Sequence, residues 1–132
     1  MYVDTDVFIA LLKKHDRLKQ PAIKIFKTAK EGKIELLTSA ATIVEILFFI
    51  YEYGIQKHGR RILNDLFNLK VEFVDLPSEI GLEAVALMDK YDVTPLDAIH
   101  AVAAGPEILS TDKVYERIGL KRVDPTILAG EL

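Results

Sequence analysis

Four acidic side chains give this sequence its candidate chemistry: Asp4, Glu45, Asp97 and Asp112. Carboxylate oxygens are hard ligands, and Mg²⁺ typically takes one or two of them together with waters and substrate phosphate. Two like charges about 5 Å apart repel by about 3 kcal/mol at an effective dielectric of about 20. Acids that converge on one pocket therefore need protons or a divalent cation. If these four converge, we expect a Mg²⁺ or Mn²⁺ site.

Glu45 has the most unusual surroundings of the four. Its helical neighbours include Ala41, Phe48 and Phe49. A carboxylate buried without a partner in such an apolar setting is very costly, so an ion or a hydrogen-bond donor is expected beside it. The alternative is that Glu45 marks a narrow solvent-facing strip together with Glu52.

The other acids each have a simpler explanation as helix caps. Asp97 is the third residue after Thr94, which is the spacing of a capping box. Asp4, Asp6 and Asp112 could be turn or capping residues that a helix dipole favours. Taken singly, these residues leave both interpretations open. The grouping of the acids favours the metal site.

Composition narrows the choice of metal. The chain has 132 residues, no cysteine and three histidines. This excludes disulfides and cysteine-ligated zinc, and it favours Mg²⁺ or Mn²⁺ over zinc. His100 lies about one turn after Asp97, and we expect it to pack in the core or to contact the metal-binding side chains without binding the metal itself. His15 and His58 stand in polar stretches and are expected to face solvent.

Length and hydropathy indicate one soluble domain over residues 1–132. Half of the residues are hydrophobic, which is enough for a single sizeable core. No stretch approaches the roughly 18–20 apolar residues of a spanning helix, and the start of the chain has no signal-like segment. We expect a cytoplasmic protein without membrane association. The net charge of −3 argues against a generally basic surface, although a local basic rim remains compatible with it.

Short β-like runs alternate with helical stretches along the chain, and these elements must position the acids. The expected strands are residues 1–3, 35–38, 71–74, 108–110 and 121–123. The expected helices are residues 5–14, 19–31, 39–53, 56–69, 78–91, 94–104 and 113–118, with serines at 39 and 78 as caps.

This alternation predicts an α/β fold, a three-layer α/β/α sandwich around a mostly parallel central sheet. The carboxyl ends of parallel strands share one edge, and ligand sites of such sheets lie there. The acids expected at that edge, or one or two helical turns above it, are Asp4, Asp6, Glu45, Asp97 and Asp112.

Four sequence blocks resemble the PIN domain family. They are VDTDVFIALL at 3–12, TSAATIVEIL at 38–47, TPLDAIHAVAA at 94–104 and ILSTDKVYERIG at 108–119. The blocks follow the family's order with comparable spacing, and together they span nearly the whole chain. The resemblance implies a PIN-like fold in which Asp4, Glu45, Asp97 and Asp112 bind the metal.

The resemblance also identifies supporting residues. Asp6 stands where the family often has asparagine. Thr5 and Thr111 are small hydroxyl residues beside the first and last acids, suited to orienting a carboxylate or a water, or simply to capping a helix. Some family members carry a further acid after the last block, and Glu116 is the nearest candidate here.

Small single-domain PIN proteins include the toxins of VapBC-type toxin–antitoxin pairs. The resemblance therefore implies a metal-dependent endoribonuclease that hydrolyses RNA phosphodiester bonds, with a cognate antitoxin as partner and a homodimer as assembly. The alternatives are an RNA-processing PIN nuclease that is no toxin, a non-catalytic RNA- or protein-binding module, and a phosphatase that starts with the Asp4-Thr5-Asp6 pattern. The phosphatase interpretation leaves Glu45 unexplained.

Two surface features bear on partners. The run 46–53 holds more aromatic residues than one helix face buries easily, so it predicts either a partner surface or a densely packed core. Basic residues gather in three groups that could contact RNA phosphates or could be ordinary solvated faces. These groups are Lys13, Lys14 and Arg17; Lys57, Arg60 and Arg61; and Lys113, Arg117, Lys121 and Arg122.

Overall fold

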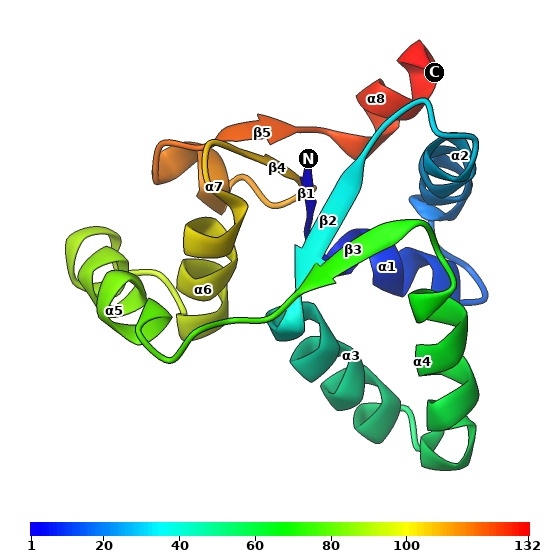
Figure 1. Ribbon diagram of the computed structural model, residues 1–132, viewed down its shortest axis with the longest axis horizontal. Coiled ribbons are helices and arrows are strands. Elements are labelled where there is room, and N and C mark those ends of the chain that lie inside the picture. Colours follow the sequence, from blue (N-terminus) through cyan, green and yellow to red (C-terminus); the bar gives the residue numbers. More distant parts are fainter.

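A computed structural model describes residues 1–132 as an α/β fold around a five-stranded, all-parallel sheet (Figure 1). The strand order across the sheet is β3-β2-β1-β4-β5. The strands are β1 (Tyr2–Val3), β2 (Leu36–Ser39), β3 (Val71–Val74), β4 (Glu107–Leu109) and β5 (Lys121–Val123). The predicted three-layer architecture is confirmed.

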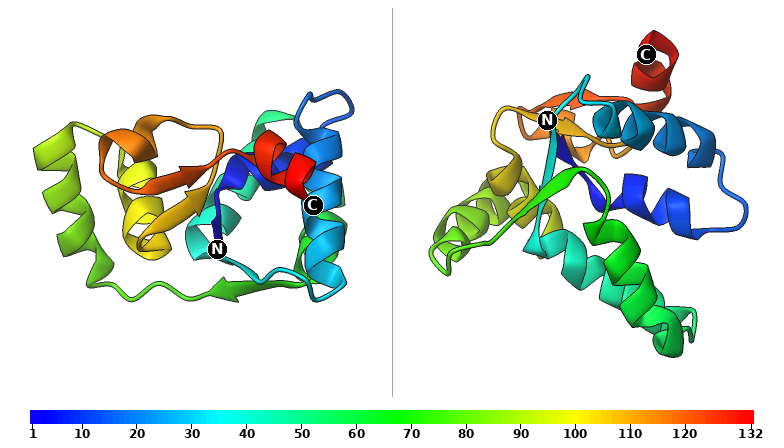
Figure 2. Two further views of the ribbon diagram at one scale, coloured as in Figure 1. Left: turned by 90° about the horizontal axis from the view of Figure 1, so that it is seen from above. Right: turned by 45° about the vertical axis from the view of Figure 1, so that its right-hand side comes forward.

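Helices cover both faces of the sheet (Figures 1 and 2). One face carries α1 (Thr5–Leu12), α2 (Lys19–Lys30), α3 (Ala40–Glu52), α4 (Gly59–Phe67) and α8 (Pro125–Glu131). The other face carries α5 (Ile80–Tyr91), α6 (Pro95–Ala104) and α7 (Val114–Arg117). None of these helices has both the length and the apolar character needed to cross a lipid bilayer.

Each central strand contributes side chains to two hydrophobic cores, because successive strand residues point to opposite faces of the sheet. Tyr2 and Ile108 pack in the core beneath α5 and α6. Their neighbours Val3 and Leu109 pack in the larger core with α1 and α2. The sheet is therefore buried on both sides, as parallel sheets generally are, and its strands hold the connecting loops at a fixed edge.

The direction in which strands are added to the sheet reverses between β1 and β4. The chain proceeds outward from β1 to β2 and β3, and then returns to the other side of β1 to form β4 and β5. Val3 pairs with Leu109, and the Asp4 backbone N–H donates to the Leu109 carbonyl at 3.0 Å. Ligands of open α/β sheets bind at such a switch in strand order, beyond the carboxyl ends of the strands.

The structure corrects several predicted elements. The predicted helix 56–69 is a short 3₁₀ turn, η1 (Gln56–His58), followed by α4. Helix α5 begins at Ile80 without a side-chain cap, so the expected cap at Ser78 is wrong. Helix α1 ends at Leu12 rather than at residue 14. Helix α8 was not predicted at all; Asp124 caps its start, and it packs on α2.

Candidate metal centre

Asp4 lies at the carboxyl end of β1 and caps α1. Its Oδ1 accepts the backbone N–H of Thr5 at 2.8 Å, and its Oδ2 accepts the Ser110 hydroxyl at 2.6 Å. The residue is buried. The capping interpretation is therefore correct for one oxygen, while the Ser110 contact ties the carboxylate to the end of β4.

Glu45 points from α3 toward the same edge of the sheet. The Thr5 hydroxyl donates to its Oε1 at 2.8 Å, and the His100 ring contacts the same oxygen. Its side chain is 31% exposed, whereas Glu52 is exposed and forms no ion pair or hydrogen bond through its carboxylate. Glu45 therefore belongs to a polar cluster, and on its exposed side it lines a surface hollow together with Glu52. Thr5 acts here as a hydroxyl donor to the cluster.

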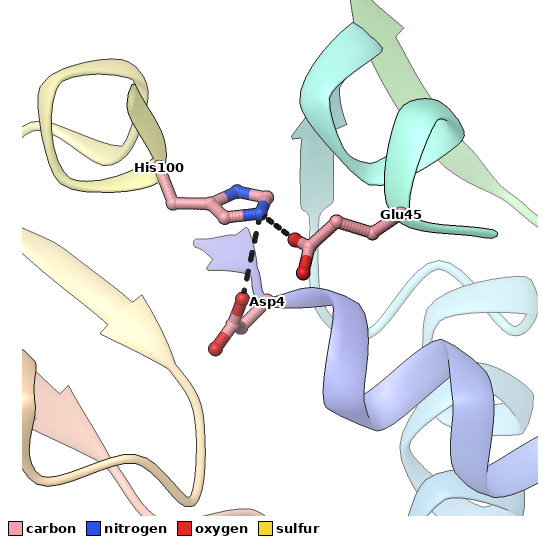
Figure 3. Close-up of side chains that lie close together, drawn as sticks. All are labelled: Asp4, Glu45 and His100. Carbon is pink, nitrogen blue, oxygen red and sulfur yellow. Dashed lines mark hydrogen bonds and ion pairs between the residues drawn. The ribbon is translucent and has the colours of Figure 1, made fainter. Parts of the chain in front are cut away.

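His100 brings α6 to this cluster and is only 1% exposed. Its Nδ1 lies 2.7 Å from the Tyr2 hydroxyl, which in turn lies 2.7 Å from the Ser39 hydroxyl. Its Nε2 faces Glu45 and lies 3.7 Å from Asp4 Oδ1 (Figure 3). The imidazole is thus packed in the core, as expected, and one ring nitrogen also faces the acids.

Asp4, Glu45 and His100 meet the distance requirement for holding one metal ion. One ligand atom from each lies within 4.8 Å of the others. Bonds of about 2.1 Å to Mg²⁺ place neighbouring ligand atoms about 3 to 4 Å apart, so small side-chain movements would bring these atoms around one ion. The three residues come from the start of α1, from α3 and from α6 (Figure 3).

Asp97 and Asp112 lie outside this group of three but near it. Asp97 occupies the first turn of α6, and its backbone N–H donates to the Thr94 hydroxyl at 3.3 Å. Asp112 follows β4, and its Oδ1 accepts the Val114 N–H at 2.9 Å. Burial raises the pKa of Asp97, and the charges of Asp112 and Glu45 raise it further.

Asp6 carries the one buried side-chain polar atom without a hydrogen-bond partner, its Oδ1. Its other oxygen accepts the backbone N–H of Thr111 at 2.9 Å and the Thr111 hydroxyl. A buried, unpartnered carboxylate oxygen is unfavourable, and a cation would satisfy it. This atom therefore fits a metal centre, with Thr111 fixing the carboxylate that carries it.

Glu116 lies apart from these acids. Its Oε1 accepts the Nε–H of Arg122 at 2.9 Å, and the side chain is largely exposed. The structure therefore places Glu116 in a surface ion pair with Arg122 and does not bring it to the candidate centre.

Three aspartates of the centre have raised pKa values and so resist ionisation, whereas Glu45 does not. Burial, reinforced by the nearby charge of Asp6, raises the pKa of Asp4 to about 6. Burial also raises the pKa of Asp6 and of Asp97. Burial acts in the same direction on Glu45, but hydrogen bonds from His100 and Thr5 outweigh it and lower its pKa. Without a cation, this cluster therefore favours bound protons.

Tyr115 of α7 is a buried phenol with a raised pKa. Burial raises this pKa most, and the charges of four carboxylates raise it further: Asp4, Asp97, Asp112 and Glu45. Tyr115 is only 1% exposed and packs in the core beneath α5 and α6. Its phenol therefore favours the neutral form.

Sequence reasoning missed three residues that shape the centre. Ser110 donates to Asp4, Tyr2 contacts the His100 ring, and Tyr115 is a buried phenol whose raised pKa comes from burial and from the charges of the acids. Only Ser110 had a usable signal, because it ends the predicted strand directly before Thr111. The helical spacing between Asp97 and His100 did place both on one side of α6.

Comparison with known proteins supports the architecture. A PIN domain family model matches residues 1–119. A toxin–antitoxin complex from Klebsiella pneumoniae is similar, with 20% identity, 94% of this chain and 96% of that chain covered, and a TM-score of 0.62. VapBC2 from Rickettsia felis, bound to a DNA fragment from its promoter, has 16% identity, 93% and 98% coverage, and a TM-score of 0.68.

A third solved structure extends this similarity. VapC20 from Mycobacterium tuberculosis, described as a sarcin–ricin loop cleaving toxin, has 13% identity, 92% and 97% coverage, and a TM-score of 0.71. No curated protein matches the chain in sequence. The structural similarities establish the fold, and the family model extends over all four sequence blocks. The chain therefore belongs to the PIN domain family.

Proposed function

We propose that this protein is a Mg²⁺- or Mn²⁺-dependent endoribonuclease and the toxin of a toxin–antitoxin pair. The observation that carries the proposal is the meeting of Asp4, Glu45 and His100, whose ligand atoms lie within 4.8 Å of one another. Asp6 adds a buried oxygen that lacks a partner. Membership of the PIN family supports the same activity and removes the reason for a phosphatase interpretation.

Each group of residues has its own task in this proposal. Asp4, Glu45, Asp97 and Asp112 would hold the metal, with Asp6 assisting. When bound, a divalent cation lowers the pKa of a water and neutralises charge on the leaving oxygen of a phosphodiester. Thr5 and Thr111 fix the Glu45 and Asp6 carboxylates by hydrogen bonds. The rigid placement of these donors and acceptors is the protein's contribution.

The proposal includes two protein partners. Two of the similar structures are a toxin–antitoxin complex and VapBC2, which supports an antitoxin partner for this chain. We also propose a homodimer that forms through exposed apolar residues of α3. These residues are Val44, Leu47, Phe48 and Tyr51. A contiguous patch of this kind is typical of interaction surfaces.

RNA cleavage by the purified protein tests the proposed activity. We expect cleavage with Mg²⁺ or Mn²⁺ and none with EDTA. Asp4→Asn and Asp97→Asn should each lose at least ~10²-fold in rate, which is the scale for removing one key electrostatic group. Asp89→Asn changes an exposed acid of α5 and serves as the matched control. Equal activity of the three variants would contradict the proposal.

Expression of the chain alone separates a toxin from a housekeeping nuclease. A toxin should arrest growth, and Asp4→Asn should abolish the arrest. Metal-dependent RNA cleavage without growth arrest would favour the RNA-processing nuclease. Growth arrest that persists in Asp4→Asn would rule out the acidic centre as its cause.

A further inference from the structure

A cleft of about 530 Å³ lies beside the acidic centre. Its walls come from three distant parts of the chain: the loop between α1 and α2, the segment after β4, and the junction of β5 with α8. The polar and charged side chains in these walls are Arg17, Thr111, Lys113, Arg122, Asp124 and Thr126.

The cleft carries a local excess of positive charge in a chain whose net charge is −3. Arg122 is already engaged: it pairs with Glu116 at 2.9 Å and with Asp124 at 3.4 Å. Arg17 and Lys113 are exposed, and neither forms an ion pair. Two cations are therefore available to an anionic ligand, and the one acid in the wall is already neutralised.

The cleft and the acidic centre share one wall residue. Thr111 lines the cleft and also donates from its backbone and its hydroxyl to Asp6. Asp112 lies between Thr111 and Lys113 in the chain, so a cation flanks the last acid of the centre. A ligand in the cleft would therefore lie next to the segment that carries Asp112.

We propose that this cleft is a subsite for an RNA backbone phosphate next to the phosphodiester that the acidic centre cleaves. This inference rests on the proposed ribonuclease function. Arg17 supplies a planar fork of donors that suits phosphate oxygens, and Lys113 supplies a mobile point charge. Contacts of this kind position the nucleic acid and set its register without reading its sequence. The neighbouring acids cannot do so, because they repel phosphate until a cation is bound.

Binding of a short fluorescent single-stranded RNA tests the subsite separately from catalysis. The measurement uses anisotropy with the Asp97→Asn protein in Mg²⁺, so that cleavage does not consume the probe. Adding Arg17→Gln and Lys113→Gln should raise Kd about 10-fold. The slope of log Kd against log salt should fall by about 0.7, because one lost phosphate contact on a single strand contributes about that much.

The matched control removes two positive charges elsewhere, with Lys24→Gln and Lys30→Gln on α2. These residues are exposed and do not line the cleft. An equal loss of affinity in the control pair would overturn the subsite, because only the net charge would then matter. Unchanged melting temperatures in both pairs would show that neither pair disturbs the fold.

Chemically altered RNA identifies the ligand group. Replacing one phosphate at a time with a neutral methylphosphonate should weaken binding to the Asp97→Asn protein at one position next to the cut. The same replacement should have no further effect when Arg17 and Lys113 are also changed. If the cleft variants keep their RNA affinity but lose binding of a poly-glutamate peptide, the cleft is a protein-docking site and the proposal fails.

The proposed function and the subsite fail in different ways. If RNA binding depends on Arg17 and Lys113 but the parent protein does not cleave RNA, the subsite proposal stands and the nuclease proposal is wrong. RNA cleavage by the parent, together with cleft variants of unchanged affinity, would keep the nuclease and remove the subsite.

Discussion

At the scale of single residues, Asp4 combines burial with negative neighbours. Its pKa of about 6 exceeds the ordinary value of 3.8, so the metal-free folded protein binds a proton at Asp4 that the unfolded chain has already released. Between about pH 4 and pH 6 the folded state therefore holds more protons, and stability falls as the pH rises through this window.

This linkage gives a prediction for the metal-free protein. In EDTA, ionisation of Asp4 should lower the free energy of unfolding by up to about 3 kcal/mol between pH 4 and pH 7. Asp4→Asn cannot ionise at this position, so its stability should fall less over the same range. Urea denaturation across the pH series measures both. Parallel pH profiles of stability for the parent and Asp4→Asn would show that the pKa of Asp4 is not raised in the folded protein.

A divalent cation should reverse this penalty, because it stabilises the ionised carboxylates. At pH 7, Mn²⁺ in about 100-fold excess over its Kd should stabilise the folded state by about 2.7 kcal/mol, which raises Tm by several degrees. Protons compete for the same oxygens, so the rise should be smaller at pH 5. Thermal melts in MnCl₂ and in EDTA measure it. Asp4→Asn should lose the rise and Asp89→Asn should keep it; an equal rise in both would place the ion elsewhere.

His100 should matter for stability independently of any metal. Its ring is fully enclosed and satisfies the Tyr2 hydroxyl. His100→Ala would leave a cavity and remove one of the two hydrogen-bond partners of the buried Tyr2 hydroxyl, and we expect a loss of about 2 to 4 kcal/mol in urea denaturation with EDTA. His58→Ala changes an exposed ring and should cost less than about 0.5 kcal/mol. Similar values for the two variants would contradict the buried role of His100.

At the scale of elements, helix α6 carries both Asp97 and His100. The cap at its first turn should therefore affect the metal centre as well as stability. Thr94 caps the helix through the Asp97 backbone N–H. Thr94→Ala should cost about 1 kcal/mol in the free energy of unfolding and should also weaken Mn²⁺ binding, since the first turn positions Asp97. Thr126→Ala removes an exposed hydroxyl that forms no side-chain hydrogen bond and is the control. Unaltered Mn²⁺ affinity in Thr94→Ala would show that the cap does not position Asp97 for metal binding.

The elements also show which parts of the structure a sequence can predict. Strand β3 and the Ser39 cap follow from local signals, an apolar run before a turn and a serine before a helix. Helix α8 has only seven residues and is held by packing against α2. Too short for a clear helical periodicity, it offered no pattern apart from Asp124-Pro125. The predicted helix 56–69 is interrupted at η1 for a similar reason. Tertiary contacts, and not the local sequence alone, decide whether a short helical turn forms.

The candidate site divides in the same way. Asp4, Asp6 and Asp112 follow predicted strands, and Asp97 opens a predicted helix, so their places at the sheet edge could be argued from local sequence. Glu45 lies in the middle of a predicted helix, and only its apolar neighbours singled it out. The meeting of Asp4, Glu45 and His100 depends on three helices packing together, which no local pattern encodes. The Ser110 bond to Asp4 likewise requires β1 and β4 to be neighbours, although 106 positions separate the two residues.

At the scale of the whole molecule, α3 links the core to an exposed surface. Ile46, Phe49 and Ile50 are buried, whereas Phe48 and Tyr51 are 57% and 71% exposed. The sequence left open whether the aromatic run 46–53 packs in the core or forms a partner surface. Both apply, since one side of the helix packs inward and the other faces solvent. Val44, Leu47 and Tyr51 recur at helical spacing, which makes the exposed side one continuous stripe.

Oligomeric state tests the proposed use of this stripe. The parent should be a dimer by light scattering at micromolar concentration, and Leu47→Glu with Phe48→Glu should give a monomer, because two copies would bury like charges in the interface. Leu82→Glu with Val85→Glu changes equally exposed apolar residues of α5 and should leave the dimer intact. A monomeric parent would remove the homodimer. A dimer that only the α5 pair disrupts would move the interface to α5, on the other face of the sheet.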